Sequence, residues 1–246
     1  MLTNLQYRML KRIAPRSRAS CDDSVYEGKS KLTLLGTELL RKIAGKTVID
    51  FGCGEGREAI EIAQRGAKRV IGIDIRDDIL EIARKRAFDA GLQDTCQFVS
   101  STAERADIVV SIDAFEHFSD PAGILRIMDT LLKAGGEVLV SFGPTWYHPL
   151  GGHLFSVFPW AHLLFREQAL IRWRSGFKTD GATRFGEVAG GLNQMTVRKF
   201  ERLIATSPFQ VAALQLLPIH SLRFAHNRWT REYTTALVRC RLIKRT

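Results

Sequence analysis

The sequence lacks a long apolar run. Its longest strongly apolar stretch, from His153 to Phe165, has 13 residues and contains a proline, whereas a helix needs roughly 20 apolar residues to cross a bilayer. The first 18 residues also lack the continuous apolar stretch and the small-residue cleavage site of a secretory signal. We therefore expect no transmembrane helix and a cytoplasmic location.

Cysteine is scarce, and internal repeats and low-complexity segments are absent. The cysteines lie far apart without a CxxC pair, at Cys21, Cys53, Cys96 and Cys240. This spacing argues against a zinc knuckle or a disulfide framework, so we expect reduced thiols. The composition, with 45% hydrophobic and 25% charged residues, excludes collagen-like, coiled-coil and wholly disordered chains.

Acidic residues are few at the two ends of the chain. Residues 1–46 contain 10 basic and 4 acidic residues, and residues 219–246 contain 7 and 1, so each end carries a net charge of +6. The whole chain carries +10, which leaves −2 for residues 47–218. An anionic partner would therefore meet the ends of the chain. Solvated basic tails are the alternative interpretation.

The centre of the chain contains short β-branched runs that alternate with helical patterns. The strand-like runs begin near Lys46, Arg69, Thr95, Ala106 and Gly136. Such alternation predicts a parallel sheet with crossover helices. The stretch from Ser101 to Ala106 is too short for a helical crossover. A helix is predicted over Pro121–Lys133, with Gly135 and Gly136 ending it.

After Phe142 the regular pattern breaks. Residues 143–192 are rich in aromatic residues, glycine and histidine without a steady period, which predicts an insertion at the carboxyl end of a strand. A helix is predicted over Asn193–Ser207. Two strand-like runs follow at Phe209–Ile219 and Glu232–Ile243, and we expect them to pair as an antiparallel hairpin with a long loop and no helix between them.

The clearest chemical signal is the segment Asp50–Gly56, which reads DFGCGEG where a strand turns into a helix. Glycines at such a turn let the backbone approach a ligand, and the helix N-terminus directs N–H groups at it. Dinucleotide-binding folds have G-x-G-x-x-G there. Here the spacing is G-x-G-x-G, and Asp50 precedes the first glycine. A carboxylate would repel pyrophosphate but suits a ligand with an ammonium and a sulfonium group, which is S-adenosylmethionine.

These features resemble the class I S-adenosylmethionine-dependent methyltransferases, close to the small-molecule group called type 11. The resemblance covers roughly Leu32 to Phe142, and further ordered matches are Val70–Asp74, Ala106–His117 and Leu131–Leu139. It implies a Rossmann-like α/β fold with a seven-stranded sheet of order 3-2-1-4-5-7-6, an antiparallel last strand and a lid insertion after the fifth strand.

The resemblance also implies roles for single residues. Asp50 lies near the methionine amino group, Asp74 holds the ribose hydroxyls and Ile75 packs on adenine. The other residues assigned to the cofactor are Gly52, Cys53, Gly54, Gly56, Thr102 and Ser111. Thr102 or Glu104 would replace the acid that the family places after the third strand. The structural alternatives are a tight turn for the glycines and a helix cap for Asp50.

Methyl transfer needs alignment and, for some acceptors, removal of a proton, and it requires no metal. The candidate bases are His117, His148 and His153, each of which could instead be an ordinary loop histidine. Without a third close ligand, His148 and His153 argue against a metal site. The aromatic residues of the insertion could cover an apolar acceptor or form the core of a cap. These residues are Trp146, Tyr147, Phe155, Phe158, Trp160 and Phe165.

At the N-terminus a helical stripe of apolar residues lies opposite basic residues. The stripe consists of Leu2, Leu5, Met9 and Ile13, and the basic residues are Arg8, Lys11 and Arg12. The pattern is typical of a helix that docks on the protein, and an interfacial helix near anionic lipid is the alternative.

We expect a single methyltransferase domain with a basic helical segment (1–45), a cofactor-binding core (46–142), a substrate lid (143–192) and a C-terminal helix and hairpin (193–246). The expected reaction is methyl transfer from S-adenosylmethionine to oxygen or nitrogen of a small, apolar or aromatic molecule. The alternatives are a nucleic-acid methyltransferase, against which stands the lack of a base-clamping Asn-Pro-Pro-Tyr motif, and a cofactor-binding regulator without activity.

Overall fold

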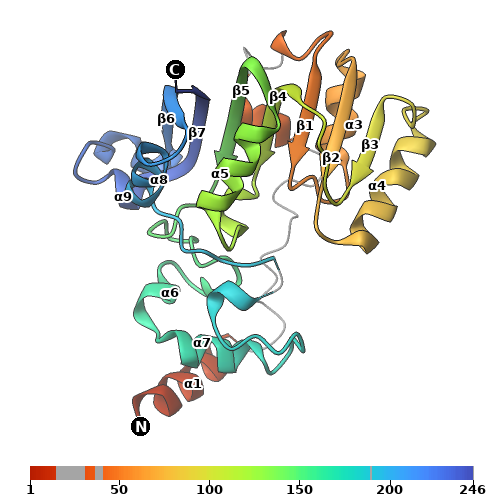
Figure 1. The fold of residues 1–246 in the computed structure, drawn as a ribbon. Coiled ribbons are helices and arrows are strands. Elements are labelled where there is room, and N and C mark those ends of the chain that lie inside the picture. The colour runs from red at the N-terminus through yellow and green to blue at the C-terminus, as the bar shows by residue number, and fades with distance from the viewer. Residues whose placement is uncertain (15–30, 37–40, 189, 246) are drawn as a thin grey trace.

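Seven strands form one sheet among the residues that the computed structural model describes, which are 1–14, 31–36, 41–188 and 190–245 (Figure 1). The strand order is β3-β2-β1-β4-β5-β7-β6. β7 runs antiparallel to β5 and β6, and the other neighbouring strands are parallel. The expected order and directions are therefore confirmed. The strands are β1 (Thr47–Phe51), β2 (Arg69–Ile73), β3 (Cys96–Val99), β4 (Ala106–Ile112), β5 (Leu132–Phe142), β6 (Phe209–Pro218) and β7 (Thr235–Lys244).

Helices cover both faces of this sheet and make three layers. On one face, the cluster around Ile62, Leu80 and Val70 joins the sheet to η3, a 3₁₀ helix, and to two α-helices. On the other face, Leu125 and Phe200 join a second cluster. Burying one apolar stripe of each helix in this way supplies most of its stability. The helices are η3 (Lys31–Leu35), α3 (Arg57–Gln64) and α4 (Asp77–Asp89) on the first face, and α5 (Pro121–Thr130) and α8 (Val197–Ala205) on the second.

The insertion after β5 forms a cap with its own hydrophobic cluster, which includes Phe155, Trp173 and Phe185. Helix α1 (Leu2–Ile13) belongs to this cap, because Leu10 joins the same cluster. In Figure 1 the cap lies beyond the ends of the strands, with α1 beside α7. The helical elements of the insertion are η5 (His153–Phe155), α6 (Ala161–Leu164), α7 (Glu167–Arg174) and η6 (Phe185–Glu187).

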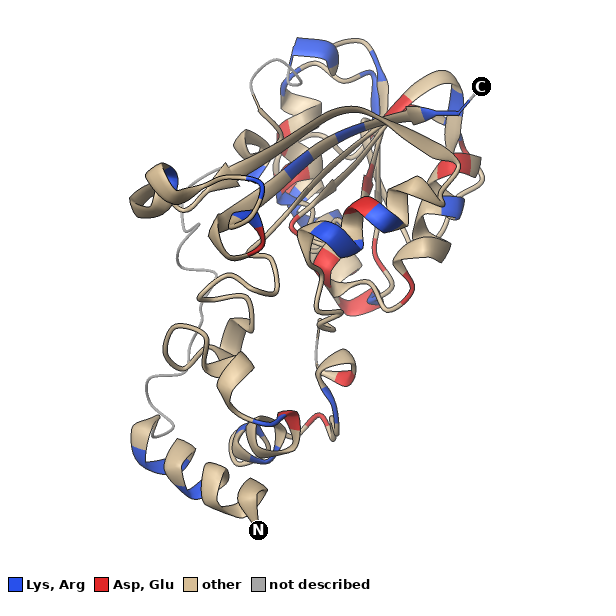
Figure 2. Ribbon diagram, turned by 90° about the vertical axis from the view of Figure 1, so that its left-hand side faces the viewer, with Lys and Arg blue, Asp and Glu red and all other residues tan. Residues whose placement is uncertain are grey.

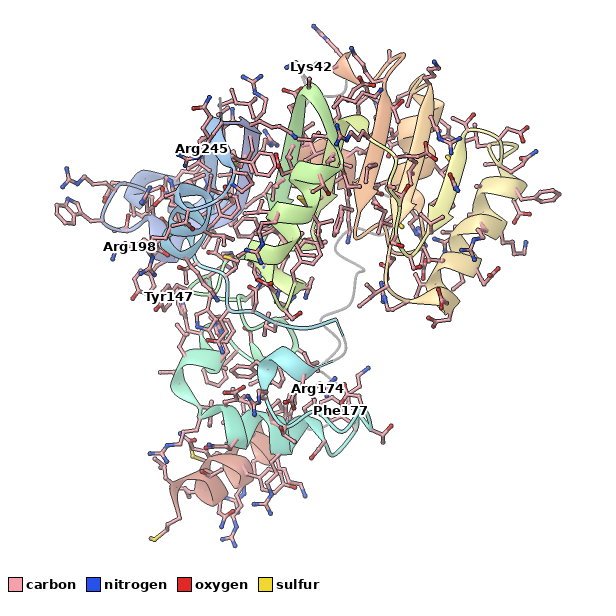
Figure 3. All side chains as sticks on the ribbon, viewed as in Figure 1. Lys42, Tyr147, Arg174, Phe177, Arg198 and Arg245 are labelled. Atoms are coloured by element: carbon pink, nitrogen blue, oxygen red, sulfur yellow. The ribbon has the colours of Figure 1, made fainter. Side chains whose placement is uncertain are left out.

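An ion pair inside the cap holds the chain after α7. The guanidinium of Arg174, which lies in the cap in Figure 3, donates to both carboxylate oxygens of Asp180 at 2.6 and 2.5 Å. The Arg174 side chain is only 6% exposed. Of the aromatic residues expected either to cover an acceptor or to form a cap core, Phe155 is buried in the core, and Trp146 and Phe165 pack against it.

Several expected boundaries were wrong. Helix α5 ends at Thr130, and Gly135 and Gly136 lie within β5 instead of ending the helix. Helix α8 starts at Val197, because Thr196 caps it by accepting a hydrogen bond from the Lys199 backbone N–H. Short helices do occur between β6 and β7, contrary to expectation: η7 (His220–Ala225) and α9 (Arg231–Thr234).

Other expectations hold. The connection between β3 and β4 contains no helix, and β6 pairs with β7 as an antiparallel hairpin. The short 3₁₀ helix η4 (Phe115–His117) follows β4. Cys53, Cys96 and Cys240 are free thiols, while Cys21 lies outside the described residues. In the part of the chain that the structure describes, every helix is too short or too polar to cross a membrane.

Candidate active site

The carboxyl ends of β1, β2 and β4 lie side by side and bring the motif residues together. Parallel pairing sets Asp50 of β1 beside Gly72 of β2 and Val110 of β4. The glycine loop is anchored on β2, because the Gly52 backbone N–H donates to the carbonyl oxygen of Ile73 at 2.8 Å. Ligands of open α/β sheets bind at this edge.

The three glycines of the motif all have left-handed backbones, with φ of 84° at Gly52, 50° at Gly54 and 76° at Gly56. A Cβ at Gly52 or Gly56 would lie within 2.9 Å of neighbouring side chains, so these two glycines permit close packing inside the protein. A Cβ at Gly54 would meet nothing closer than Arg76 Nη2 at 4.0 Å. The space in front of Gly54 is therefore the part of the loop that a ligand can approach.

Asp50 is a buried carboxyl group without a full set of partners. Its residue is 2% exposed, and Oδ2 has no hydrogen-bond partner within the described residues. Burial, and then the charges of Glu58 and Asp74, raise the pKa of Asp50 well above its usual value. An ammonium group bound beside Oδ2 would pair with it and favour the charged form. The site thus fits the amino group of S-adenosylmethionine.

Asp74 follows β2, and its carboxylate is fully engaged. Oδ1 accepts hydrogen bonds from the backbone N–H and the Nε of Arg76, both at 3.0 Å. Oδ2 accepts from the Gly54 backbone N–H at 3.0 Å and from Arg76 Nη2 at 3.1 Å. Burial opposes ionisation of Asp74, but the bonds from Arg76 and Gly54 outweigh it, so its pKa is lowered.

This arrangement sets a condition for ribose binding. A carboxylate has about four acceptor positions, and those of Asp74 are all taken. Two of the four bonds come from the Arg76 side chain, which is 53% exposed. A ribose diol fits Asp74 once Arg76 withdraws Nε and Nη2. Arg76 was not among the residues predicted for the site, although its position two residues after Asp74 was an available signal.

The other residues assigned to the cofactor have varied surroundings. Ile75 is 90% exposed beside Asp74, so its apolar surface is available to adenine. Thr102 Oγ1 accepts a hydrogen bond from the Glu104 backbone N–H. The Glu104 carboxylate pairs with Arg69 at the start of β2, at the opposite edge of the sheet from Asp74. Roles for Ile75 and Thr102 stay predictions.

Cys53 is buried within the glycine loop, and Ser111 is buried in β4. Burial, and then the charges of Asp50 and Asp74, raise the pKa of the Cys53 thiol far above its ordinary value, so it is not a nucleophile. Ser111 is fully buried, and its Oγ has no hydrogen-bond partner in the described ranges. Their contacts with a cofactor also stay predictions.

Beyond β4, η4 places Glu116 and His117 near the glycine loop. Glu116 is 2% exposed, and burial and then the Asp113 charge raise its pKa well above the usual value. His117 Nδ1 lies 2.8 Å from the carbonyl oxygen of Gly191. Because a carbonyl oxygen only accepts, Nδ1 carries the hydrogen of the neutral ring, and the Nε2 lone pair is directed elsewhere. His117 therefore meets the requirement of a general base.

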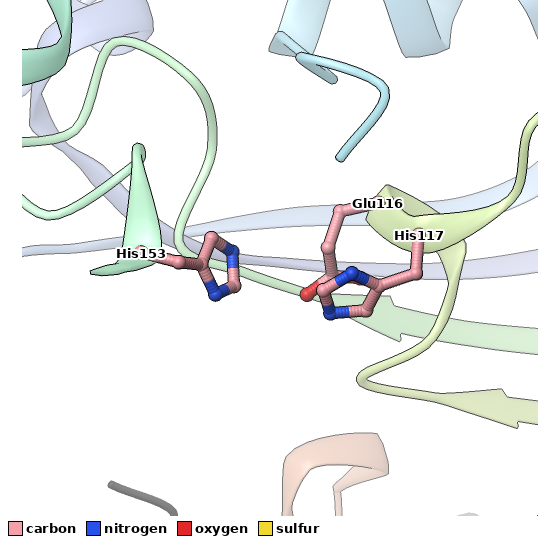
Figure 4. A group of neighbouring side chains, drawn as sticks. All are labelled: Glu116, His117 and His153. Carbon is pink, nitrogen blue, oxygen red and sulfur yellow. The ribbon is translucent and has the colours of Figure 1, made fainter. Parts of the chain in front are cut away.

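The two candidate bases of the insertion, His148 and His153, differ. The His153 ring lies 5.2 Å from the His117 ring, centroid to centroid, although the residues are far apart in sequence (Figure 4). Burial, and then the His117 charge, lower the pKa of His153 to about 4, so its ring is neutral at pH 7. His148 Nδ1 accepts a hydrogen bond from the Leu150 backbone N–H at 3.0 Å, which engages its lone pair and disfavours it as a base.

Glu116, His117 and His153 also have the spacing of a metal site. Each offers one ligand atom, and these atoms all lie within 4.8 Å of one another. Two imidazoles and a carboxylate are ligands that zinc and related divalent cations accept. Such a cation would require the lone pairs of His117 and His153, so metal binding and proton transfer by His117 exclude each other. In sequence, His148 is the histidine nearest to His153, and no local pattern indicates that Glu116 and His117 lie beside it.

Comparisons with known proteins agree with this geometry. Residues 42–144 match a family model described as a methyltransferase domain. The ubiquinone biosynthesis O-methyltransferase of Stutzerimonas stutzeri (strain A1501) is 41% identical over 105 residues, which are 40% of this chain and 45% of that protein. The corresponding protein of Aeromonas salmonicida (strain A449) is 37% identical over 39% of this chain and 43% of its own length. The chain thus spans less than half the length of these curated relatives.

Solved structures support the fold over a longer part of the chain. Magnesium protoporphyrin IX methyltransferase from Synechocystis PCC 6803, solved with bound SAH, has a TM-score of 0.57 and 15% identity, and the match covers 99% of this chain and 96% of that one. An S-adenosylmethionine-dependent methyltransferase from Mesorhizobium loti has a TM-score of 0.56 and 18% identity, with 86% and 100% covered. The matched methyltransferase-domain model covers residues 42–144, and these solved structures share the fold of the chain.

Proposed function

We propose that this chain transfers the methyl group of S-adenosylmethionine to a hydroxyl oxygen of a small apolar or aromatic molecule. The proposal rests on the geometry of His117. Its Nδ1 is held by the carbonyl oxygen of Gly191, which leaves Nε2 as an acceptor near the glycine loop. The segment after β4 that carries His117 is adjacent to the glycine loop, because a Cβ at Gly52 would lie 2.9 Å from the Ala114 side chain. The names of the relatives, ubiquinone biosynthesis O-methyltransferases, support oxygen as the methylated atom.

The proposed mechanism divides the work among few side chains. When bound, S-adenosylmethionine would supply a methyl carbon for in-line attack by the acceptor oxygen, with S-adenosylhomocysteine as the leaving group. Asp50 would bind the methionine ammonium group. Asp74 would hold the ribose hydroxyls once the Arg76 side chain has released the Asp74 carboxylate. His117 Nε2 accepts the proton of the acceptor hydroxyl. Because the pKa of His153 is lowered to about 4, its ring is neutral at pH 7 and adds no positive charge beside His117.

The cap is proposed as the cover of the acceptor. It follows β5 and lies over the carboxyl ends of the strands, where the glycine loop and Asp74 are. Tyr147 of the cap contacts Tyr233 of the segment between β6 and β7, with ring centroids 5.2 Å apart. This aromatic pair adds apolar surface where the cap meets the segment between β6 and β7, which suits an apolar acceptor. A cytoplasmic location stays a prediction.

The test combines cofactor binding with turnover on a panel of phenols and catechols. We expect His117→Gln to lower turnover by roughly 10²–10⁴-fold, the usual contribution of a general base, with unchanged affinity for S-adenosylhomocysteine. His220→Gln is the control, because His220 is an exposed residue of η7. Unchanged turnover of His117→Gln would contradict the base assignment.

Two further outcomes would replace the proposed reaction. Salt-sensitive methylation of RNA or DNA with an inactive phenol panel would indicate a nucleic-acid methyltransferase. Tight cofactor binding without methylation of any acceptor class would indicate a regulator. Loss of turnover on chelation that a divalent cation restores would point to a metal at Glu116, His117 and His153, and it would contradict His117 as the base.

A further inference from the structure

Helix α1 has two apolar faces, and only one of them packs on the protein. Leu10 is fully buried in the cap cluster, and the Trp173 Nε1 of α7 donates to the carbonyl oxygen of Ala14 at 3.0 Å. The predicted docking stripe is a different set of residues, and it stays exposed. The exposed fractions are 46% for Leu2, 56% for Leu5, 45% for Met9 and 50% for Ile13.

The exposed stripe continues from α1 onto the neighbouring part of the cap. Gln6 Nε2 donates to the carbonyl oxygen of Leu164 at 3.4 Å, and Gln6 Oε1 accepts from the Arg166 backbone N–H at 3.0 Å. Leu163 is 38% exposed and Leu164 is 65% exposed. Two elements distant in sequence therefore form one apolar surface. We call it the Leu5 surface, and it consists of Leu2, Leu5, Met9, Ile13, Leu163 and Leu164.

Cations border this surface along α1. Arg8, Lys11 and Arg12 are exposed, and α1 contains no acidic residue. At 100° per residue, Arg8 and Arg12 lie on the side of the stripe away from Leu10. Figure 2 shows the basic bands on α1 at the lower end of the molecule. The helix thus has a packed face, an exposed apolar face and a cationic face, in that order around its axis.

We propose that the Leu5 surface docks on an anionic lipid bilayer, with α1 lying in the plane of the headgroups. An interfacial helix buries its apolar face by about 5–10 Å, and each lysine or arginine near an anionic surface adds to the binding. A second copy of the chain would bring two cationic rows together. A nucleic acid would pair with the cations but leave the leucines in water. Only the bilayer satisfies both the apolar and the cationic parts.

Docking would place the cap at the membrane surface, where apolar molecules dissolve. This consequence is independent of methyl transfer, because vesicle binding is measured without turnover. The full chain should sediment with vesicles of phosphatidylcholine that contain about 30% phosphatidylglycerol and much less with pure phosphatidylcholine. Binding should weaken in about 0.5 M NaCl, which screens the cations.

Leu5→Gln/Met9→Gln should lower vesicle binding by about tenfold or more, since both side chains lose apolar burial in the bilayer. The matched control is Phe88→Gln on α4, which removes a side chain that is 69% exposed elsewhere on the surface. Circular dichroism and thermal unfolding confirm that the variants fold. Equal binding by wild type and Leu5→Gln/Met9→Gln would overturn the proposal.

Two other outcomes would also overturn it. Equal binding to neutral and anionic vesicles would mean that the cations play no part. A concentration-dependent dimer that Leu5→Gln/Met9→Gln dissociates, without vesicle binding, would make a second copy the occupant of the Leu5 surface.

Discussion

Arg76 and ribose compete for the same carboxylate, and this competition yields a prediction at the scale of one residue. Replacing Arg76 with glutamine removes the two side-chain bonds to Asp74 and leaves the backbone bonds from Gly54 and Arg76. Because an exposed ion pair contributes little, we expect S-adenosylhomocysteine to bind about two- to fivefold more tightly to Arg76→Gln. Titration calorimetry measures the change.

The control is Arg65→Gln, which removes the same charge from an arginine that pairs with Glu61 at 2.6 Å, outside the glycine loop. It should leave the affinity within about twofold of wild type. A 2′,3′-dideoxy nucleoside should gain nothing from Arg76→Gln, because it offers no diol to Asp74. Weaker binding of S-adenosylhomocysteine to Arg76→Gln would instead show that Arg76 contacts the cofactor.

A second residue-scale prediction concerns Gly54. Gly54→Ala should weaken S-adenosylhomocysteine binding by about tenfold or more, because the added Cβ enters the space in front of the loop and φ of 50° strains the backbone. Thermal unfolding should show a folded protein, since the Cβ meets no protein atom closer than 4.0 Å. Normal affinity in the folded variant would contradict the placement of the cofactor.

At the scale of elements, substitutions on the two apolar faces of α1 should affect stability to different extents. Leu10→Ala should lower the free energy of unfolding by about 2–4 kcal/mol, because it opens a cavity in the cap cluster. Leu5→Ala should change it by less than about 0.5 kcal/mol, because Leu5 is 56% exposed. Urea titration measures both, and similar losses would contradict the observed docking face.

The cap histidines give the protein an acid-sensitive element. The pKa of His153 is about 4 in the folded protein against an ordinary value of 6.5. The unfolded chain therefore binds the proton first, and this group's contribution to stability is lost as pH falls from 6.5 towards 4. His153→Gln should reduce the acid-induced loss of stability between pH 7 and 4.5 by about 2 kcal/mol.

Wild type and His153→Gln must be compared, because other groups change the stability with pH in the opposite direction. The pKa values of Asp50 and Glu116 are raised, so protonation of these two groups favours the folded state as pH falls. Urea unfolding at both pH values isolates the histidine by difference. An unchanged acid sensitivity of His153→Gln would show that His153 is accessible to protons when folded.

At the scale of the whole molecule, the structure changes how lid movement is expected to occur. The glycine pairs Gly151–Gly152 and Gly190–Gly191 flank the aromatic stretch of the insertion, where they could act as flexible joints. A Cβ at Gly151 would lie 2.2 Å from the Thr145 carbonyl oxygen, and one at Gly152 would lie 2.3 Å from His162. These two glycines therefore permit tight packing. The cap also has its own core, so we expect it to move as one unit.

Hydrogen exchange tests this expectation. Amides of α7 should exchange slowly with and without cofactor and acceptor, because Leu170 and Trp173 are buried in the cap cluster. Ligand-dependent protection should be confined to the junction at residues 143–152. Protection that spreads through α7 on ligand binding would show that the cap orders as it closes.

The sequence by itself determined the sheet and the cofactor edge, for a local reason. Strand and helix periods depend on neighbours in sequence, and Asp50, the glycines and Asp74 each end or follow a buried strand. Parallel pairing then brings such strand ends together without further information. Helix boundaries were less well determined, because the capping bond of Thr196 and the left-handed backbone of Gly135 within β5 are features of single residues.

Only the tertiary structure decided the contacts between distant segments. His153 meets Glu116 and His117 because the cap folds back over η4. Leu10, and not the more regular stripe through Leu5, became the docked residue of α1. Periodicity identifies apolar faces but not the surface that each face meets, and that surface exists only once α7 and the cap cluster have assembled.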